Sequence, residues 1–160
     1  MPKKSVKENK NAYMVSRENA NLTREAASEK IFISSDRIYR IENGATPAPD
    51  EVLQMAKGYH DMSLCNYYCA YECNIGKEYM PLVKLGNLPQ ITLEMLATLN
   101  KLNKEKERLI EITADGAITK DEMPDFLSIK EALDKMSYTI DSLTLWVNQK
   151  IAEGEISNLN

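Results

Sequence analysis

The sequence predicts an all-α protein, built from an N-terminal bundle of five short helices and a C-terminal antiparallel helical hairpin of the coiled-coil type. Apolar residues recur at helical spacing along nearly the whole chain, and no segment shows the alternation typical of a strand. Glycine and proline separate the periodic segments. Near the C-terminus the apolar spacing becomes a regular heptad pattern.

The composition is that of a globular protein. Hydrophobic residues make up 43% and charged residues 28% of the 160 positions, which argues against a disordered chain and allows one domain or two small ones. No apolar run reaches the ~20 residues of a membrane span. No apolar stretch follows the basic N-terminus as it would in a secretory signal. Three cysteines cannot all pair within one chain, which favours a reducing compartment. We therefore expect a cytoplasmic protein without a membrane partner.

The charges are unevenly distributed along the chain. Residues 1–44 hold nine lysines and arginines against six acidic residues, whereas residues 45–160 hold eleven against eighteen. Although the net charge is −4, residues 1–44 are basic, which gives weak support for a nucleic-acid partner.

The five short helices are expected at residues 10–20, 24–31, 34–42, 49–59 and 63–76. Thr23 can cap the second of these helices, and Ser34 or Ser35 can cap the third. Gly44 follows the third helix as a stop signal, and Pro49 suits the first turn of the fourth. Short helices at this density form a compact bundle.

Two long helices follow, and Asp115-Gly116 is expected to fold them back as an antiparallel hairpin. Apolar residues of the first fall at Leu88, Met95, Leu99, Leu102 and Leu109. The second carries a regular heptad seam of Phe126, Ile129, Leu133, Met136, Ile140, Leu143 and Val147. A two-helix hairpin cannot bury so much apolar surface alone, so we expect these seven residues to form the dimer interface of a four-helix bundle.

Residues 17–58 resemble the helix-turn-helix of Xre/Cro-type, lambda-repressor-like transcriptional regulators. The resemblance lies in a threonine that opens the second helix, a tight turn, a serine that caps the third helix, and the run Ile41-Glu42-Asn43-Gly44 followed by proline. The chain departs from the family at Arg24, where glutamine is usual, and at Phe32, where glycine is common. The resemblance implies a DNA-binding domain.

The third helix is expected to lie in the major groove of double-stranded DNA, because its two isoleucines face the protein and its polar residues face outward. Expected base contacts are Ser35, Asp36, Arg37, Tyr39 and Arg40, and expected phosphate contacts are Thr23, Arg24, Ser34 and Asn43. Asp36 could accept from a cytosine amine or orient Arg40 from four residues away. The family resemblance further implies that Arg17 pairs with Glu42.

We expect a sequence-specific transcriptional repressor that binds a palindromic operator as a homodimer and is associated with the nucleoid. Residues 1–76, with a basic arm at 1–10, are the expected DNA-binding domain, 77–88 the linker, and 89–155 the dimerisation hairpin. Two alternatives stay open. One is an antitoxin-like or defence-system interaction module whose DNA binding is autoregulatory, and the other is a thiol- or metal-responsive regulator.

The thiol alternative rests on Cys65, Cys69 and Cys73, which recur every four residues shortly after His60. On a straight helix the outer two lie ~12 Å apart, too far for Zn–S bonds of ~2.3 Å. We therefore expect a buried cysteine stripe and no metal site.

Two further functions are not expected. Residues 111–122 carry part of a calcium-loop pattern, but Glu111 and Thr113 at its first and third positions fall on the incoming helix, so a helix–helix turn is expected. The chain has one histidine and shows no phosphate loop, nucleophile elbow or metalloprotease motif. We expect neither enzymatic activity nor a cofactor.

Overall fold

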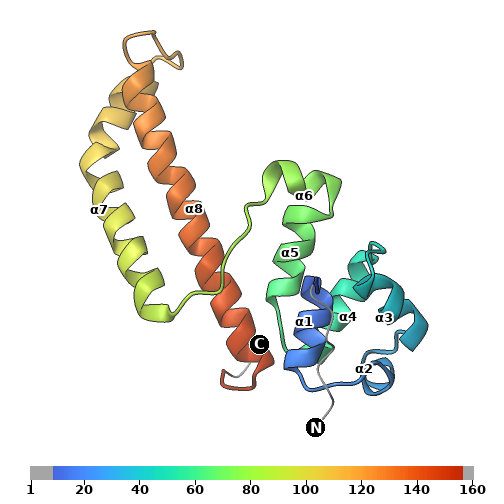
Figure 1. Ribbon diagram of the computed structural model, residues 1–160. Coiled ribbons are helices and arrows are strands. Elements are labelled where there is room, and N and C mark those ends of the chain that lie inside the picture. The colour runs from blue at the N-terminus through green and yellow to red at the C-terminus, as the bar shows by residue number, and fades with distance from the viewer. Residues whose placement is uncertain (1–8, 157–160) are drawn as a thin grey trace. The chain divides into compact units, whose positions relative to one another are not determined.

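The structure is a computed structural model that describes residues 9–156, and all regular elements in that range are helices (Figure 1). The helices are α1 Ala12–Asn19, α2 Arg24–Ile31, α3 Ser35–Glu42, α4 Pro49–Tyr59, α5 Ser63–Tyr71, α6 Asn74–Tyr79, α7 Leu88–Thr113 and α8 Met123–Ala152. The all-α prediction is confirmed. The chain divides into two units: the first takes the residues up to Lys84 and those from Val147 onward, and the second takes Leu85–Trp146.

The first helices begin and end where local sequence signals place them. The Thr23 hydroxyl accepts from the Ala26 backbone N–H at 3.1 Å, and the Ser34 hydroxyl accepts from the Arg37 backbone N–H at 3.2 Å. Each satisfies a donor that the first turn of a helix leaves open. Asn21 has a φ of 57°, the left-handed conformation that ends α1.

The prediction of one helix over residues 63–76 is wrong, because the chain turns between α5 and α6. Cys73 caps α6, with its Sγ accepting from the Gly76 backbone N–H at 3.4 Å. A Cβ added at Gly76 would lie 2.0 Å from the backbone oxygen of Cys69. Gly76 is therefore a close crossing point of two short helices, and the predicted role as the end of one helix does not apply.

The core of the first unit is apolar and lies among α1 to α5. Ile38 and Ile41 give this core one face of α3, and each is 1% exposed. The buried members of the core are Tyr13, Ala27, Ile31, Ile33, Ile38, Ile41, Val52, Met55, Ala56, Tyr59 and Leu64.

Gly58 of α4 lies directly against Ile31 of α2. A Cβ at this position would stand 2.1 Å from Ile31 Cγ2, and Ile31 is 2% exposed. The variant Gly58→Ala is therefore expected to lose about 1–3 kcal/mol of unfolding free energy in urea denaturation, because overpacking outweighs the better helix propensity of alanine. Gly86→Ala is the control, since its Cβ would meet Ile91 at an ordinary 3.5 Å. Equal stability of the two variants would show that Ile31 can move aside.

In the second unit, α7 and α8 lie side by side and run in opposite directions (Figure 1). Arg108 Nε donates to Asp125 Oδ2 at 2.8 Å across the pair, and Thr98 and Ala132 line a small cavity between the helices. The buried residues of the second unit are Ile91, Thr98 and Ile112 of α7 and Ile129, Ala132, Thr139, Ser142 and Leu145 of α8. No helix among the described residues is long and apolar enough to cross a membrane.

The heptad seam of α8 is divided between two surfaces. Ile129 is 2% exposed and buried inside the hairpin, whereas Leu133 and Ile140 are 47% and 49% exposed. Helical rotation of ~100° per residue places Leu133 and Ile140, seven residues apart, on one strip about a quarter turn from the side that faces α7.

Of the exposed aliphatic residues of α7, one matches the strip on α8. Leu96, Leu99 and Ile110 are 52%, 48% and 67% exposed. Leu99 lies about a quarter turn from the inner side of its helix, in the same rotational sense as the strip on α8, whereas Leu96 and Ile110 lie ~160° from the inner side, on the outer face of α7. Because the helices are antiparallel, equal rotations bring Leu99 to the same side of the hairpin as Leu133 and Ile140. We name this surface the apolar strip and define it by Leu99, Leu133 and Ile140.

Candidate nucleic-acid interface

α2 and α3 are joined by a turn of three residues, Phe32 to Ser34. Phe32 takes a φ of 56° and its side chain is 89% exposed, while Ile33 is 6% exposed and anchors the turn in the core. A left-handed backbone is favourable for glycine and strained for phenylalanine. The turn nevertheless keeps the geometry of a tight helix–turn–helix connection, so the sequence departure at Phe32 leaves the fold intact.

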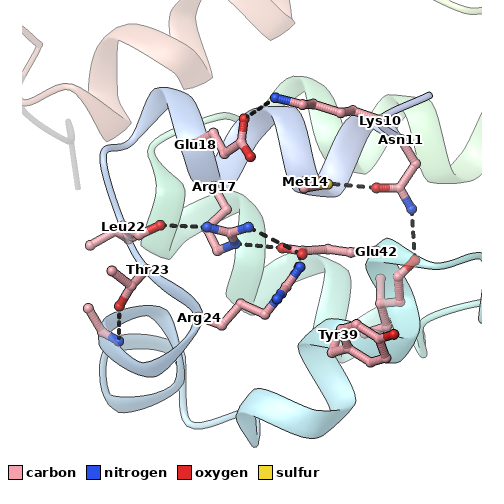
Figure 2. A network of polar contacts seen from close by, with 12 residues as sticks. Lys10, Asn11, Met14, Arg17, Glu18, Leu22, Thr23, Arg24, Tyr39 and Glu42 are labelled. Atoms are coloured by element: carbon pink, nitrogen blue, oxygen red, sulfur yellow. Dashed lines mark hydrogen bonds and ion pairs between the residues drawn. The ribbon is translucent and has the colours of Figure 1, made fainter. Parts of the chain in front are cut away.

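A buried ion-pair network holds α1, α2 and α3 together (Figure 2). Arg17 donates to Glu42 twice, from Nε to Oε1 at 2.5 Å and from Nη2 to Oε2 at 3.2 Å, and its Nη1 donates to the Leu22 carbonyl at 2.6 Å. Arg24 Nε donates to Glu42 Oε2 at 2.7 Å. The structure thus brings together Arg17 and Glu42 and ties the start of α2 to the same carboxylate.

The electrostatics of this network follow from its burial. The side chains of Arg17 and Glu42 are 8% and 1% exposed. Burial acts to lower the pKa of Arg17, but the hydrogen bond and the charge of Glu42 outweigh it, so the pKa is raised. Burial, followed by the negative charge of Glu42, raises the pKa of the Tyr59 hydroxyl. Both groups therefore keep their ordinary charge states at neutral pH.

Arg24 lies at the edge of this network. Its guanidinium carbon is 5.1 Å from the centre of the Tyr39 ring, and its side chain is 32% exposed. The ion pair with Glu42 and the cation–π contact hold the side chain between α2 and α3. The sequence predicts a phosphate contact for Arg24, and the structure shows that its Nε donates to Glu42.

Asp36 and Arg40 form an ion pair on the outer side of α3. Arg40 Nη2 lies 2.6 Å from Asp36 Oδ2, and the two side chains are 65% and 66% exposed. Of the two roles considered for Asp36, the structure displays the orientation of Arg40 from four residues away.

Arg37 has a different environment from Arg40. Its Nε and Nη2 donate to Glu51 Oε1 and Oε2 at 2.8 and 2.7 Å, and Nη2 also donates to the Thr46 carbonyl at 3.1 Å. The hydrogen bond from Arg37 lowers the pKa of Glu51 against the opposing effect of burial, and the bond to Glu51 raises the pKa of Arg37. Arg37 is thus placed to connect α3 to the start of α4, a role that the sequence did not suggest.

The other predicted contact residues lie around the same face. Tyr39 is 52% exposed. Ser35 is half-buried, and Asn43 is exposed with its Nδ2 donating to the Tyr39 carbonyl at 2.7 Å. Thr23 and Ser34 are exposed helix caps.

Two positions of the site were not found from the sequence. Glu51 holds Arg37 and also accepts from the Ala48 backbone N–H at 2.7 Å. Asn11 caps α1 and donates from Nδ2 to the Ile41 carbonyl at 2.7 Å (Figure 2). An asparagine at the start of a helix is a usable cap signal, whereas the reach of Asn11 to α3 needs the folded structure.

The basic arm predicted at residues 1–10 falls mostly outside the described residues. Lys10 lies within them, and its Nζ donates to Glu18 at 2.7 Å. This contact attaches the start of the described chain to α1.

Cys65 and Cys69 of α5 and Cys73, the cap of α6, are each half-buried. Burial raises the pKa of the Cys65 thiol, which makes its reactive thiolate less abundant. Among residues 9–156, no three histidine, cysteine or acidic side chains gather as a metal site.

These features define a class of protein. It is an all-helical protein with a helix-turn-helix domain, in which α3 exposes polar residues on one side and buries apolar residues in the core on the other. The family comparison agrees. Residues 15–60 match the family model described as a helix-turn-helix domain, so this segment is a Cro/C1-type, Xre-like helix-turn-helix, as the sequence predicted. Such a domain suggests DNA binding, and its family is typically not enzymatic. Searches among curated proteins and among solved structures gave no match to the chain.

Proposed function

We propose that the protein is a transcriptional repressor that binds double-stranded DNA sequence-specifically, as a homodimer on a palindromic operator. The observation that carries this proposal is the arrangement of α3. Its apolar side is buried in the core, while Asp36, Tyr39 and Arg40 are exposed along its outer side. A helix held in this way can enter a major groove without losing its support. Binding to a chromosome would place the protein in the cytoplasm, at the nucleoid.

Arg40 is the arginine best suited to read a base. Its pair with Asp36 is exposed to solvent, and such pairs contribute only about 0–1 kcal/mol, so DNA can replace the carboxylate at little cost. To contact a base, Arg37 would have to break a bidentate ion pair with the half-buried Glu51 and a hydrogen bond to the Thr46 carbonyl. We therefore assign base reading to Arg40 and Tyr39, and a supporting role to Arg37.

The phosphate contacts are proposed at the ends of the helices. The backbone and side chains of Thr23 and Ser34 lie at the N-termini of α2 and α3, where the helix dipole favours an anion. Asn43 lies beside the C-terminal end of α3 and Arg24 at the first turn of α2. These contacts position the domain, and base contacts from α3 supply the specificity.

Dimerisation is proposed through the apolar strip of the hairpin. Two copies that place their strips face to face would form a four-helix bundle and cover three half-exposed aliphatic side chains per chain. Ile129 is already buried within one hairpin, so the proposed interface no longer includes it.

The function is tested by selecting bound duplexes from random DNA at a fixed salt concentration, because electrostatic binding varies steeply with salt. We expect enrichment of an inverted repeat whose half-sites lie about one helical turn, ~34 Å, apart. Recovery of unrelated sequences only, or of no DNA, would reject the proposal.

Arg40→Ala should weaken binding to the selected duplex by about 10- to 100-fold, because a two-pronged arginine–guanine contact contributes about 1–3 kcal/mol. The measurement is a fluorescence-anisotropy titration, together with a thermal melt that should show an intact fold. Unchanged affinity would show that α3 does not read the bases through Arg40.

Lys130→Ala provides the matched control for this variant. Lys130 and Asp134 form the same kind of exposed pair, four residues apart, on α8. The control removes one cation and one surface pair from a helix that the proposal does not place against DNA, so it should leave DNA affinity nearly unchanged.

A further inference from the structure

The C-terminal end of α8 is bonded to the turn between α4 and α5, and both segments belong to the first unit. The Met62 backbone N–H donates to Gln149 Oε1 at 2.9 Å, and Gln149 Nε2 donates to the His60 carbonyl at 2.6 Å. One side-chain amide thus pairs with a donor and an acceptor of the same turn. Gln149 is 7% exposed, although most glutamines are at the surface.

His60 adds a bond in the opposite direction. Its ring Nδ1 lies 2.7 Å from the Ala152 carbonyl at the end of α8, where helix carbonyls have no partner within the helix. Its Nε2 lies 3.2 Å from Lys30 Nζ. A carbonyl can only accept and an ammonium can only donate, so the two contacts fit a neutral ring with its proton on Nδ1. We name His60, Met62, Gln149 and Ala152 the α8 clamp.

The clamp is specific because a buried amide is costly unless its groups are bonded. The oxygen of Gln149 accepts from Met62, and its nitrogen donates to His60 and to Glu153 Oε1, the latter at 2.9 Å. The position of the α8 end is therefore fixed by directional bonds. Apolar packing alone would tolerate sliding or rotation of the helix.

α8 is one continuous helix that gives residues up to Trp146 to the second unit and its last turns to the first. We propose that Gln149 is a positioning residue for DNA binding: through the α8 clamp it holds the end of the dimerisation helix on the helix-turn-helix domain, so that the dimer sets the spacing of the two recognition helices. This inference rests on the proposed function. Without the clamp, each domain would be attached through residues 80–87, which form no helix.

The expected consequence is a change in how strictly the dimer measures its operator. A rigid connection gives the second domain a high effective concentration at one spacing and a low one at others, whereas a flexible tether tolerates several spacings. The full-length Gln149→Leu variant should therefore bind the natural spacing more weakly and other spacings relatively better.

The probes are the duplex recovered from random DNA, the same duplex with roughly five base pairs inserted between its half-sites, and a single half-site. The wild type should prefer the natural spacing over the lengthened one by about 100-fold or more. Gln149→Leu should reduce that preference to below about tenfold. Its half-site affinity and its mass in sedimentation should equal those of the wild type.

Two further variants make the test decisive. Asn148→Ala changes an exposed neighbour of Gln149 and should keep the wild-type preference. His60→Asn removes the ring bond to Ala152 while suiting the left-handed backbone at this position, where φ is 57°. If Gln149→Leu fails to fold, His60→Asn provides the test. It should likewise lower the preference for the natural spacing of the half-sites.

Unchanged spacing preference in the folded variants, with normal wild-type binding, would overturn the positioning role alone. A wild-type chain that binds no duplex as a dimer would overturn the proposed function and, with it, this inference.

Discussion

Glu42→Ala is expected to destabilise the helix-turn-helix domain by about 3–5 kcal/mol, because it leaves the Arg17 guanidinium buried without its partner. Glu42 accepts hydrogen bonds from Arg17 and Arg24, and its side chain is 1% exposed. Arg24 is partly exposed and can turn to water, whereas Arg17, at 8%, cannot. The measurement is urea denaturation of the full chain followed by far-UV circular dichroism, and a loss of this size is a large part of the stability of a small domain.

The matched control for Glu42→Ala is Glu111→Ala. Glu111 also forms an ion pair with an arginine, Arg108, but its side chain is 67% exposed, so its removal should cost less than about 1 kcal/mol. Similar losses in both variants would show that burial of the Glu42 pair has no special weight.

The double variant Arg17→Met with Glu42→Leu separates the pair from the unpaired charge. Removing both charges leaves no buried ion without a partner, so the double variant should be more stable than Glu42→Leu alone. Additive losses from the two single changes would contradict a direct interaction between Arg17 and Glu42.

The same network contains local features that a sequence predicts and long-range contacts that it does not. Helix starts at Thr23 and Ser34 were predictable because a cap is a local signal, decided by one side chain and the backbone three residues later. The bonds of Arg37 to Glu51 span fourteen residues and depend on how α3 and α4 meet. No spacing rule within one helix contains that information, so Arg37 could not be distinguished from Arg40 in the sequence.

The hairpin shows why some buried positions cannot be predicted from the apolar pattern: they hold polar residues. On α7 the buried positions Ile91, Thr98 and Ile112 follow a heptad, yet Thr98 is polar and does not belong to the apolar pattern of the sequence. The Thr98 hydroxyl donates to the Glu94 carbonyl of its own helix at 2.8 Å. Thr139 and Ser142 of α8 donate to their own helix in the same way. A hydroxyl satisfied by its own helix can be buried as a small side chain, so the buried sides of α7 and α8 are less apolar than parts of their exposed sides.

The heptad seam of α8, its most regular apolar pattern, lies partly on the outside of the hairpin, and this exposure has a functional consequence. Leu133 and Ile140 are about half exposed although they belong to the most regular seam in the sequence. If the hairpin were complete as a single copy, polar residues at these two positions would be favoured by solvation. The pattern therefore supports a second copy as the cover of the apolar strip.

The variant Leu133→Glu with Ile140→Glu should accordingly convert the protein to a monomer. Four carboxylates would face one another in the dimer, whereas in the single chain both side chains are already half in water, so the monomer fold should persist. Sedimentation equilibrium at micromolar concentration should give the mass of one chain, against two for the wild type. Affinity for the selected duplex should fall by about 100-fold or more, towards that of a half-site, because the two domains lose their linkage.

Leu127→Glu is the matched control for this double variant. Leu127 lies on the same helix and is 53% exposed, but a helix places it ~120° away from Leu133, outside the apolar strip. It should remain a dimer and bind DNA as the wild type does. A wild-type monomer at micromolar concentration would reject the dimer outright. A double variant that still forms dimers would move the interface to another surface, in which case the two exposed residues of the α8 heptad would need a different partner.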